Sequence, residues 1–162
     1  MAKSKEIKTN AMRFLDKKKI KYEVVQYECE EFTDGVDMCA VTGIPAEMSF
    51  KTLVTEGKSR NYYVFVIPVA LELDLKAAAR TVGEKSVEMI HVKDINKVTG
   101  YVRGGCSPLG MKKNYKTVID SRALKMEKIA ISGGRIGSSV ILSPKDLMES
   151  IGAQSAEIAV EI

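Results

Sequence analysis

The sequence predicts a mixed α/β fold in which a curved β-sheet or barrel is flanked by α-helices. Helical and strand-like patterns are interspersed irregularly along the chain, and two strand-like runs at residues 49–55 and 61–67 are separated only by a short turn, which predicts a β-hairpin. A doubly wound parallel sheet would instead need strands and helices in regular alternation. We therefore expect a mixed sheet with helices packed outside it.

Length and charge limit the classes of protein to consider. A chain of 162 residues with an ordinary apolar fraction fits one domain, residues 1–162, with a sizeable core. Twenty-five Lys and Arg against 21 Asp and Glu give a net charge of +4, less than the dense basic patch of a dedicated nucleic-acid binder. The charged start lacks a secretory signal, and the longest apolar run, residues 62–71, is too short to span a membrane. We expect a cytoplasmic protein without a membrane partner.

Cysteine and histidine usage argues against several kinds of site. Cys29, Cys39 and Cys106 are odd in number and show no C-x-x-C spacing, so neither a disulfide framework nor a zinc site is indicated. The one histidine, His91, follows a strand-like run and is expected at a strand end on the surface. We therefore predict no metal, no cofactor and chemistry that runs without histidine.

The first part of the chain predicts a helix and a strand. Apolar side chains recur at helical spacing over residues 5–19, where a run of lysines suits the negative end of the helix dipole. Residues 22–27 are strand-like, and residues 29–43 are weakly helical up to Gly43.

Lys51 occupies the middle of the strand predicted at residues 49–55. Alternation places it on the same side as Leu53, with Phe50, Thr52 and Val54 on the other side. A lysine there is costly unless its ammonium reaches water, a carboxylate or a ligand. Two interpretations remain open, a side chain that extends to a sheet edge and one that contacts a ligand.

The rest of the chain carries clear boundary signals. Asp74 and Gly83 bracket a helix, and Ser143, Pro144 and Asp146 begin another that ends near Gly152. Between and after them we expect strands at residues 86–90, 117–120, 128–131 and 138–142, a short helix ending at Gly100, and a strand or tail at residues 156–162.

Two glycine-rich segments are the strongest functional signal from the residues alone. They are GYVRGGCSPLG, residues 100–110, and ISGGRIG, residues 131–137. Both are compatible with tight loops at strand ends. They are also compatible with a pocket lined by backbone N–H groups that hold a carbonyl, carboxylate or phosphate. Spacing alone does not choose between these interpretations.

An ordered set of motifs resembles a known family. SFKTLV, LDLKAAARTVG, VEMI, TGYVRGGCSPLGMKK, ISGGRIG and LSPKDL follow one another as in the YbaK/EbsC family of aminoacyl-tRNA deacylases, and the resemblance covers nearly the whole chain. It is greatest for the branch that hydrolyses cysteine wrongly attached to proline tRNA, which is related to the prolyl-tRNA synthetase editing domain. The resemblance implies a mixed sheet closed toward a barrel with helices around it.

The resemblance also implies the site. Its catalytic positions are Lys51, Gly104 and Gly105, and its substrate-binding positions are Tyr27, Phe32, Thr52, Ser107, Pro108, Ser132 and Gly133. Two departures from the family pattern bear on specificity. The chain has Ser138-Ser139 where the cysteine-specific branch commonly carries an aspartate, and the loop between Tyr27 and Lys51 differs in sequence.

These residues lead to a mechanistic hypothesis. The substrate's own cysteine thiol attacks its ester carbonyl, while Lys51 and the glycine amides position the acceptor end of the tRNA, with prolyl-tRNA synthetase as a further partner. Cys106 has no evident partner base, so we do not expect it to be a nucleophile. Two alternatives stay open: editing of another mischarged tRNA such as Ala-tRNA(Pro), and a non-catalytic module that binds the tRNA end beside a synthetase.

Overall fold

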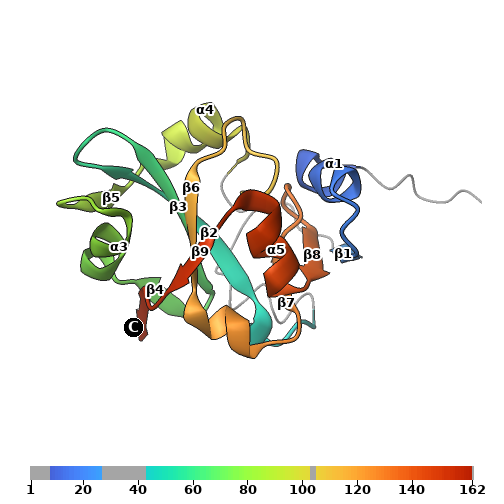
Figure 1. Ribbon diagram of the computed structural model, residues 1–162. Coiled ribbons are helices and arrows are strands. Elements are labelled where there is room, and N and C mark those ends of the chain that lie inside the picture. The colour runs from blue at the N-terminus through green and yellow to red at the C-terminus, as the bar shows by residue number, and fades with distance from the viewer. Residues whose placement is uncertain (1–7, 27–42, 103–104, 162) are drawn as a thin grey trace, which may run out of the picture.

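The fold is described from a computed structural model, which places residues 8–26, 43–102 and 105–161 (Figure 1). Its helices are α1 (Asn10–Lys17), α3 (Leu75–Val82), α4 (Ile95–Thr99) and α5 (Pro144–Ile151), with short 3-10 helices at Ala46–Met48, Val92–Asp94 and Ser121–Lys125. Its strands are β1 (Glu23–Gln26), β2 (Phe50–Gly57), β3 (Tyr62–Pro68), β4 (Leu71–Leu73), β5 (Val87–Met89), β6 (Lys116–Asp120), β7 (Ile129–Ser132), β8 (Ser138–Leu142), β9 (Gln154–Ala156) and β10 (Ala159–Glu161). None of the helices in these ranges has the length and apolar character needed to cross a lipid bilayer.

The strands form three sheets, and the largest is mixed, as predicted. It has the order β5-β2-β3-β6-β9, with antiparallel pairs on the β5 side and parallel pairs at β3–β6 and β6–β9. Strands β1, β8 and β7 form an antiparallel sheet, and β10 pairs with β4. Within the described ranges none of these sheets closes on itself, so the open-sheet form of the prediction holds and the barrel form does not.

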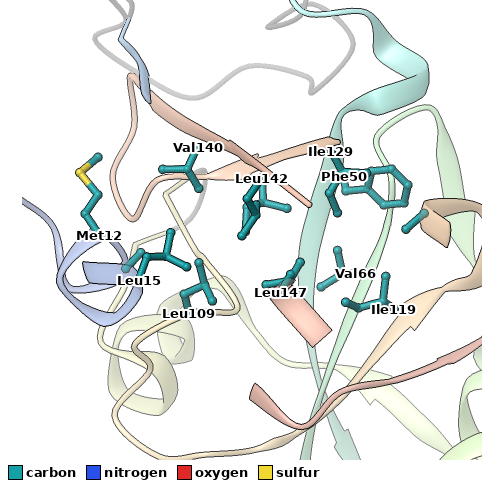
Figure 2. Close-up of a cluster of buried hydrophobic side chains, with 13 residues drawn as sticks. Met12, Leu15, Phe50, Val66, Leu109, Ile119, Ile129, Val140, Leu142 and Leu147 are labelled. Carbon is teal, nitrogen blue, oxygen red and sulfur yellow. The ribbon is translucent and has the colours of Figure 1, made fainter. Parts of the chain in front are cut away.

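A core lies on each face of the five-stranded sheet. On one face, side chains from α1, α5, β7 and β8 pack against Phe50, Val66 and Ile119 (Figure 2). On the other face, α3 packs its alanines against Phe65 and Ile67 of β3. In Figure 1 α1, α5 and the three-stranded sheet lie on one side of the large sheet, while α3 lies on the opposite side. The alternation predicted for β2 is confirmed, because Phe50 and Leu53 contact different cores.

Helix boundaries test the capping predictions. α3 has the predicted ends, since the Asp74 side chain accepts hydrogen bonds from the N–H groups of Lys76 and Ala77, and Gly83 closes the helix at φ 77°. The expected start of the first helix at residue 5 is wrong. Residues 8 and 9 are not helical, and the Thr9 hydroxyl accepts the N–H of Met12 at 3.2 Å, so α1 begins at Asn10.

The last helix confirms one capping prediction and corrects another. α5 begins at Pro144 and ends before Gly152, which has φ 67°. The Ser143 side chain, however, makes no capping hydrogen bond. Its carbonyl instead accepts the N–H of Leu147 at 3.0 Å, and Pro144 at the first helical position has no N–H to satisfy. The expected strands at residues 117–120, 128–131 and 138–142 correspond to β6, β7 and β8.

Candidate functional site

The two sheets meet where β2 runs beside β7. An isolated parallel bridge joins Ser49 to Ala130, so β2 and β7 run in the same direction from this bridge. Two residues further on lie Lys51 in β2 and Ser132 at the end of β7. Residues at the same level of parallel strands point to the same face. The topology therefore brings Lys51 and Ser132 together, although 80 residues separate them.

Ser139 belongs to the same row. It is the cross-strand partner of Ser132 in the β7–β8 pair. Along the other edge of β8 it pairs with Val25 of β1. Neighbouring residues Phe50, Ile131 and Val140 all point into the core of Figure 2. Lys51, Ser132 and Ser139 alternate with those residues, so they share the face away from that core, and all three are half-buried.

The two glycine-rich segments pack directly against each other. A Cβ atom added to Gly105 would lie 2.8 Å from the Cα of Arg135 and 3.0 Å from the backbone nitrogen of Ile136. Backbone therefore contacts backbone at this point, and only glycine leaves the room. The segments that the sequence singled out separately form one structure beside the end of β7.

The Gly105 amide already has a partner. Its N–H donates to the carbonyl of Val102 at 2.9 Å, within the same segment. Gly105 thus shapes the loop and admits the second segment, and its N–H is engaged in this conformation. Gly104, to which the same role was assigned, lies outside the described residues, as do Tyr27 and Phe32.

The serines of the two segments also hold the loops in shape. The Ser107 hydroxyl is fully buried and accepts the N–H of Leu109 at 3.2 Å, while Ser132 Oγ accepts the N–H of Gly134 at 3.1 Å. Ser132 is nevertheless half-buried and keeps a hydroxyl proton for a further acceptor. Pro108 is buried and braces the turn after Ser107.

Three buried polar atoms near the junction have no hydrogen-bond partner among the described residues. They are Thr52 Oγ1, Ser138 Oγ and Arg135 Nε. A Cβ atom added to Gly133 would lie 2.6 Å from Ser138 Oγ. Thr52 and Gly133 each come three residues after the bridge between Ser49 and Ala130, so they stand at the same level of the two strands. Buried polar atoms are rarely left unsatisfied in native proteins. The hydroxyls of Thr52 and Ser138 lie beside this glycine turn, on the face opposite the row of Lys51, Ser132 and Ser139.

A family comparison decides the identity of the domain. The model of the aminoacyl-tRNA editing domain matches residues 29–150, which include Lys51 and both glycine-rich segments. The chain belongs to the aminoacyl-tRNA editing domain family. The predicted resemblance to the YbaK/EbsC deacylases is confirmed, because the chain is 41% identical over 160 residues to a protein of Enterococcus faecalis named "Putative Cys-tRNA(Pro)/Cys-tRNA(Cys) deacylase EbsC", with 98% of each chain covered.

Solved structures share the fold of this editing domain. A crystal structure of a hypothetical protein superposes with a TM-score of 0.84 at 22% identity, covering 93% of this chain and 99% of that one. A crystal structure of "a putative trans-editing enzyme for prolyl tRNA synthetase" superposes with a TM-score of 0.82 at 23% identity, covering 96% and 99%. At these identities the likeness concerns the fold alone.

Sequence reasoning missed residues that hold the candidate site in shape. Thr9 caps α1 and also donates its hydroxyl to the carbonyl of Gly133, so it ties the helix to the second glycine-rich segment. Tyr101 is buried, and its hydroxyl donates to the carbonyl of Leu109, which closes the first segment on itself. Burial raises the Tyr101 pKa, so the phenol stays protonated and remains a donor. A threonine before a helical pattern and an aromatic within a glycine loop were the available signals.

Cys106 has the environment of an inert thiol. Burial raises its pKa to about 11, while a hydrogen bond with Thr99 acts in the opposite direction. A nucleophilic cysteine needs a lowered pKa, because the thiolate is the reactive species. The expectation that Cys106 is not the nucleophile agrees with this environment.

Proposed function

We propose that this editing domain is an aminoacyl-tRNA deacylase that removes cysteine wrongly attached to proline tRNA and also accepts Cys-tRNA(Cys). The 41% identity over 98% of both chains to the Enterococcus faecalis protein of that name carries the proposal. The match of residues 29–150 to the aminoacyl-tRNA editing domain supports the same reaction class. The activity is hydrolysis of the ester that joins an amino acid to the 3′ end of tRNA.

The substrate supplies the nucleophile in this proposal. The cysteine thiol loses its proton to water, and the thiolate sulfur attacks the carbonyl carbon of its own ester. The bond from that carbon to the ribose oxygen breaks, the ribose oxygen takes a proton from water, and a four-membered thiolactone leaves. Water then opens the ring to free cysteine. Holding the thiol against the carbonyl is worth roughly 7 to 11 kcal/mol of barrier in well-oriented intramolecular reactions.

The row of Lys51, Ser132 and Ser139 gives the protein its part in this reaction. The Lys51 ammonium stabilises negative charge on the acceptor end, either a phosphate or the carbonyl oxygen during attack. Ser132 donates its hydroxyl proton to the bound amino acid. Thr52, also predicted to bind substrate, lies on the opposite face of β2 from Lys51, where its buried hydroxyl has no partner among the described residues. Gly133, Ser107 and Pro108 shape the wall. Gly104, Tyr27 and Phe32 stay predictions, with Gly104 as the remaining glycine amide for the carbonyl.

Ser139 is the observation that favours a second candidate function. It lies opposite Ser132, at the position where the cysteine-specific branch carries an aspartate. Without that carboxylate the row has a cation and two hydroxyls, which can bind an aminoacyl end without discriminating cysteine. The alternatives are editing of Ala-tRNA(Pro) and binding without turnover.

The proposal extends to partners and location. We treat residues 1–162 as one editing domain in the cytoplasm, where charged tRNA is found. A domain of this size has little surface with which to contact the tRNA outside its acceptor end. We therefore propose that prolyl-tRNA synthetase selects the tRNA. Neither a metal nor a cofactor has a part in the proposed reaction.

A deacylation assay with matched substrates tests the proposal. Purified protein is mixed with Cys-tRNA(Pro), Cys-tRNA(Cys), Ala-tRNA(Pro) and correctly charged Pro-tRNA(Pro), and loss of the ester is followed over time. We expect rapid loss of both cysteinyl esters, slow loss of the alanyl ester and no loss of the prolyl ester. Preferential loss of Ala-tRNA(Pro) would establish the first alternative. Binding of all four without ester loss would establish the second.

A further inference from the structure

A cavity lies beside the first glycine-rich segment. Its volume is about 290 Å³, and it opens between the C-terminal ends of α1 and α5 and the chain around Pro108 to Tyr115. Pro108 lines it, while Gly105, three residues earlier, contacts the second glycine-rich segment. Three residues span at most roughly 11 Å. The cavity is therefore within about 11 Å of the contact between the two glycine-rich segments, and the first segment connects the two places.

The mouth of the cavity is basic. Lys18 and Lys113 line it and are exposed, and neither forms an ion pair with any residue in the described ranges. The two helix C-termini that face the cavity carry roughly half a negative charge each. Two full positive charges outweigh them, so the mouth favours an anion.

The interior of the cavity is apolar and partly aromatic. Phe14, Met111, Tyr115 and Ile151 line it and are half-buried. The Tyr115 ring is held firmly, because its hydroxyl donates to the carbonyl of Val98 at 2.7 Å and the rings of Tyr115 and Tyr62 form a T-shaped pair with centroids 5.9 Å apart. A fixed aromatic wall beside lysines suits single-stranded nucleic acid, whose bases stack on aromatic side chains while lysines contact the phosphates.

We infer that this cavity binds the unpaired nucleotide next to the terminal adenosine of the tRNA acceptor end. The base contacts Tyr115, while Lys113 and Lys18, whose Nζ lies 5.7 Å from the centroid of the Phe14 ring, contact the flanking phosphates. A volume of about 290 Å³ is at the lower limit of ligand pockets, which fits one nucleotide rather than a longer segment. This inference rests on the proposed function, since it assumes that an aminoacylated RNA end occupies the neighbouring site.

The test separates the nucleotide site from the reacting end. The variant K18A/K113A is compared with K58A/K85A, which removes the same charge from exposed lysines that do not line the cavity. Each protein is assayed on Cys-tRNA(Pro) and on the 3′ cysteinyl ester of adenosine, which lacks the neighbouring nucleotide. Thermal melting confirms that both variants are folded.

The expected result is selective. K18A/K113A raises KM for Cys-tRNA(Pro) about tenfold, leaves kcat within about twofold and leaves the adenosine ester unaffected. Its plot of log(kcat/KM) against log salt becomes shallower by up to about 1.4, roughly 0.7 for each lost phosphate contact on a single strand. K58A/K85A behaves like the unchanged protein. Equal KM values for the two double variants would overturn the inference.

Failure of the proposed function would be recognised separately, because the unchanged protein would then hydrolyse neither substrate. In that case the cavity is tested by fluorescence anisotropy with a labelled single-stranded CCA oligonucleotide. The inference predicts an about tenfold weaker Kd for K18A/K113A than for K58A/K85A. Equal Kd values would overturn it there as well.

Discussion

Lys51 is the residue on which the proposed chemistry depends most. It is half-buried in β2, at the level of Ser132 and on the same face. We expect K51A to lower kcat/KM for Cys-tRNA(Pro) on the order of 10²- to 10³-fold, since a preorganised charge near a developing oxyanion has effects of that size. Single-turnover deacylation measures the loss. K51R, which keeps the charge, should retain more activity than K51A, and full activity in K51A would remove this residue from the mechanism.

Cys106 provides a prediction of the opposite kind. Its pKa of about 11 leaves only about one thiol in a thousand ionised at pH 8. We expect C106A to keep most deacylase activity. In the folded protein, alkylation of Cys106 by iodoacetamide, followed by peptide mass spectrometry, should be slow at pH 8 and should accelerate about tenfold for each pH unit up to pH 10. Rapid alkylation at pH 7, or an inactive C106A, would contradict this account.

At this scale the motifs singled out Lys51 and Ser132, whose roles in the site stay predictions. Alternation along β2 gave the correct side for Lys51. The hydrogen bond from Gly105 to Val102 could not be predicted, because it depends on the loop conformation rather than on residue type. The contact of Thr9 with Gly133 is long-range and has no local signal.

Among the elements, the junction of the two glycine-rich segments has the least tolerance for change. Gly105 does not need a positive φ, so G105A tests steric room alone. Because the neighbouring atoms belong to the backbone, we expect G105A to lower the free energy of unfolding by about 1–3 kcal/mol. We also expect kcat/KM to fall about tenfold or more, because the first glycine-rich segment is displaced. Urea denaturation and the deacylation assay measure the two effects.

G152A is the matched control for that prediction. Gly152 has φ 67° and open space around the position of an added Cβ, and it lies at the end of α5 away from the junction. We expect it to lose stability, by about 1–2 kcal/mol for a left-handed alanine, with unchanged kcat/KM. G105A with normal stability and activity would show that the close approach of the segments is unimportant.

Most elements were predictable from local signals. The ends of α3 follow from Asp74 and Gly83, and the β2–β3 hairpin follows from two strand-like runs around a short turn. The start of α1 was misplaced because apolar periodicity continued past the true cap at Thr9. Segment 29–43, interpreted as weakly helical, lies outside the described residues apart from Gly43.

The whole molecule places the site at a seam between two sheets. The parallel pairs β3–β6 and β6–β9 and the bridge between Ser49 and Ala130 join parts of the chain that are distant in sequence. Local periodicity carries no information about pairing between distant strands. The sequence therefore predicted a mixed sheet, but it predicted neither the strand order nor the open edges of that sheet. The ordered set of motifs was therefore needed to associate Lys51 with the glycine-rich segments before the structure placed them.

The central claim is that the substrate's own thiol removes the amino acid, and the most direct test compares Cys-tRNA(Pro) with Ser-tRNA(Pro). The two esters differ only in sulfur or oxygen at the attacking atom, and a thiol is a few per cent ionised at pH 7 whereas a hydroxyl is not. Single-turnover rates at one enzyme concentration should favour the cysteinyl ester by at least about 100-fold. Equal rates for the two esters would contradict the account and indicate a water molecule activated by the protein.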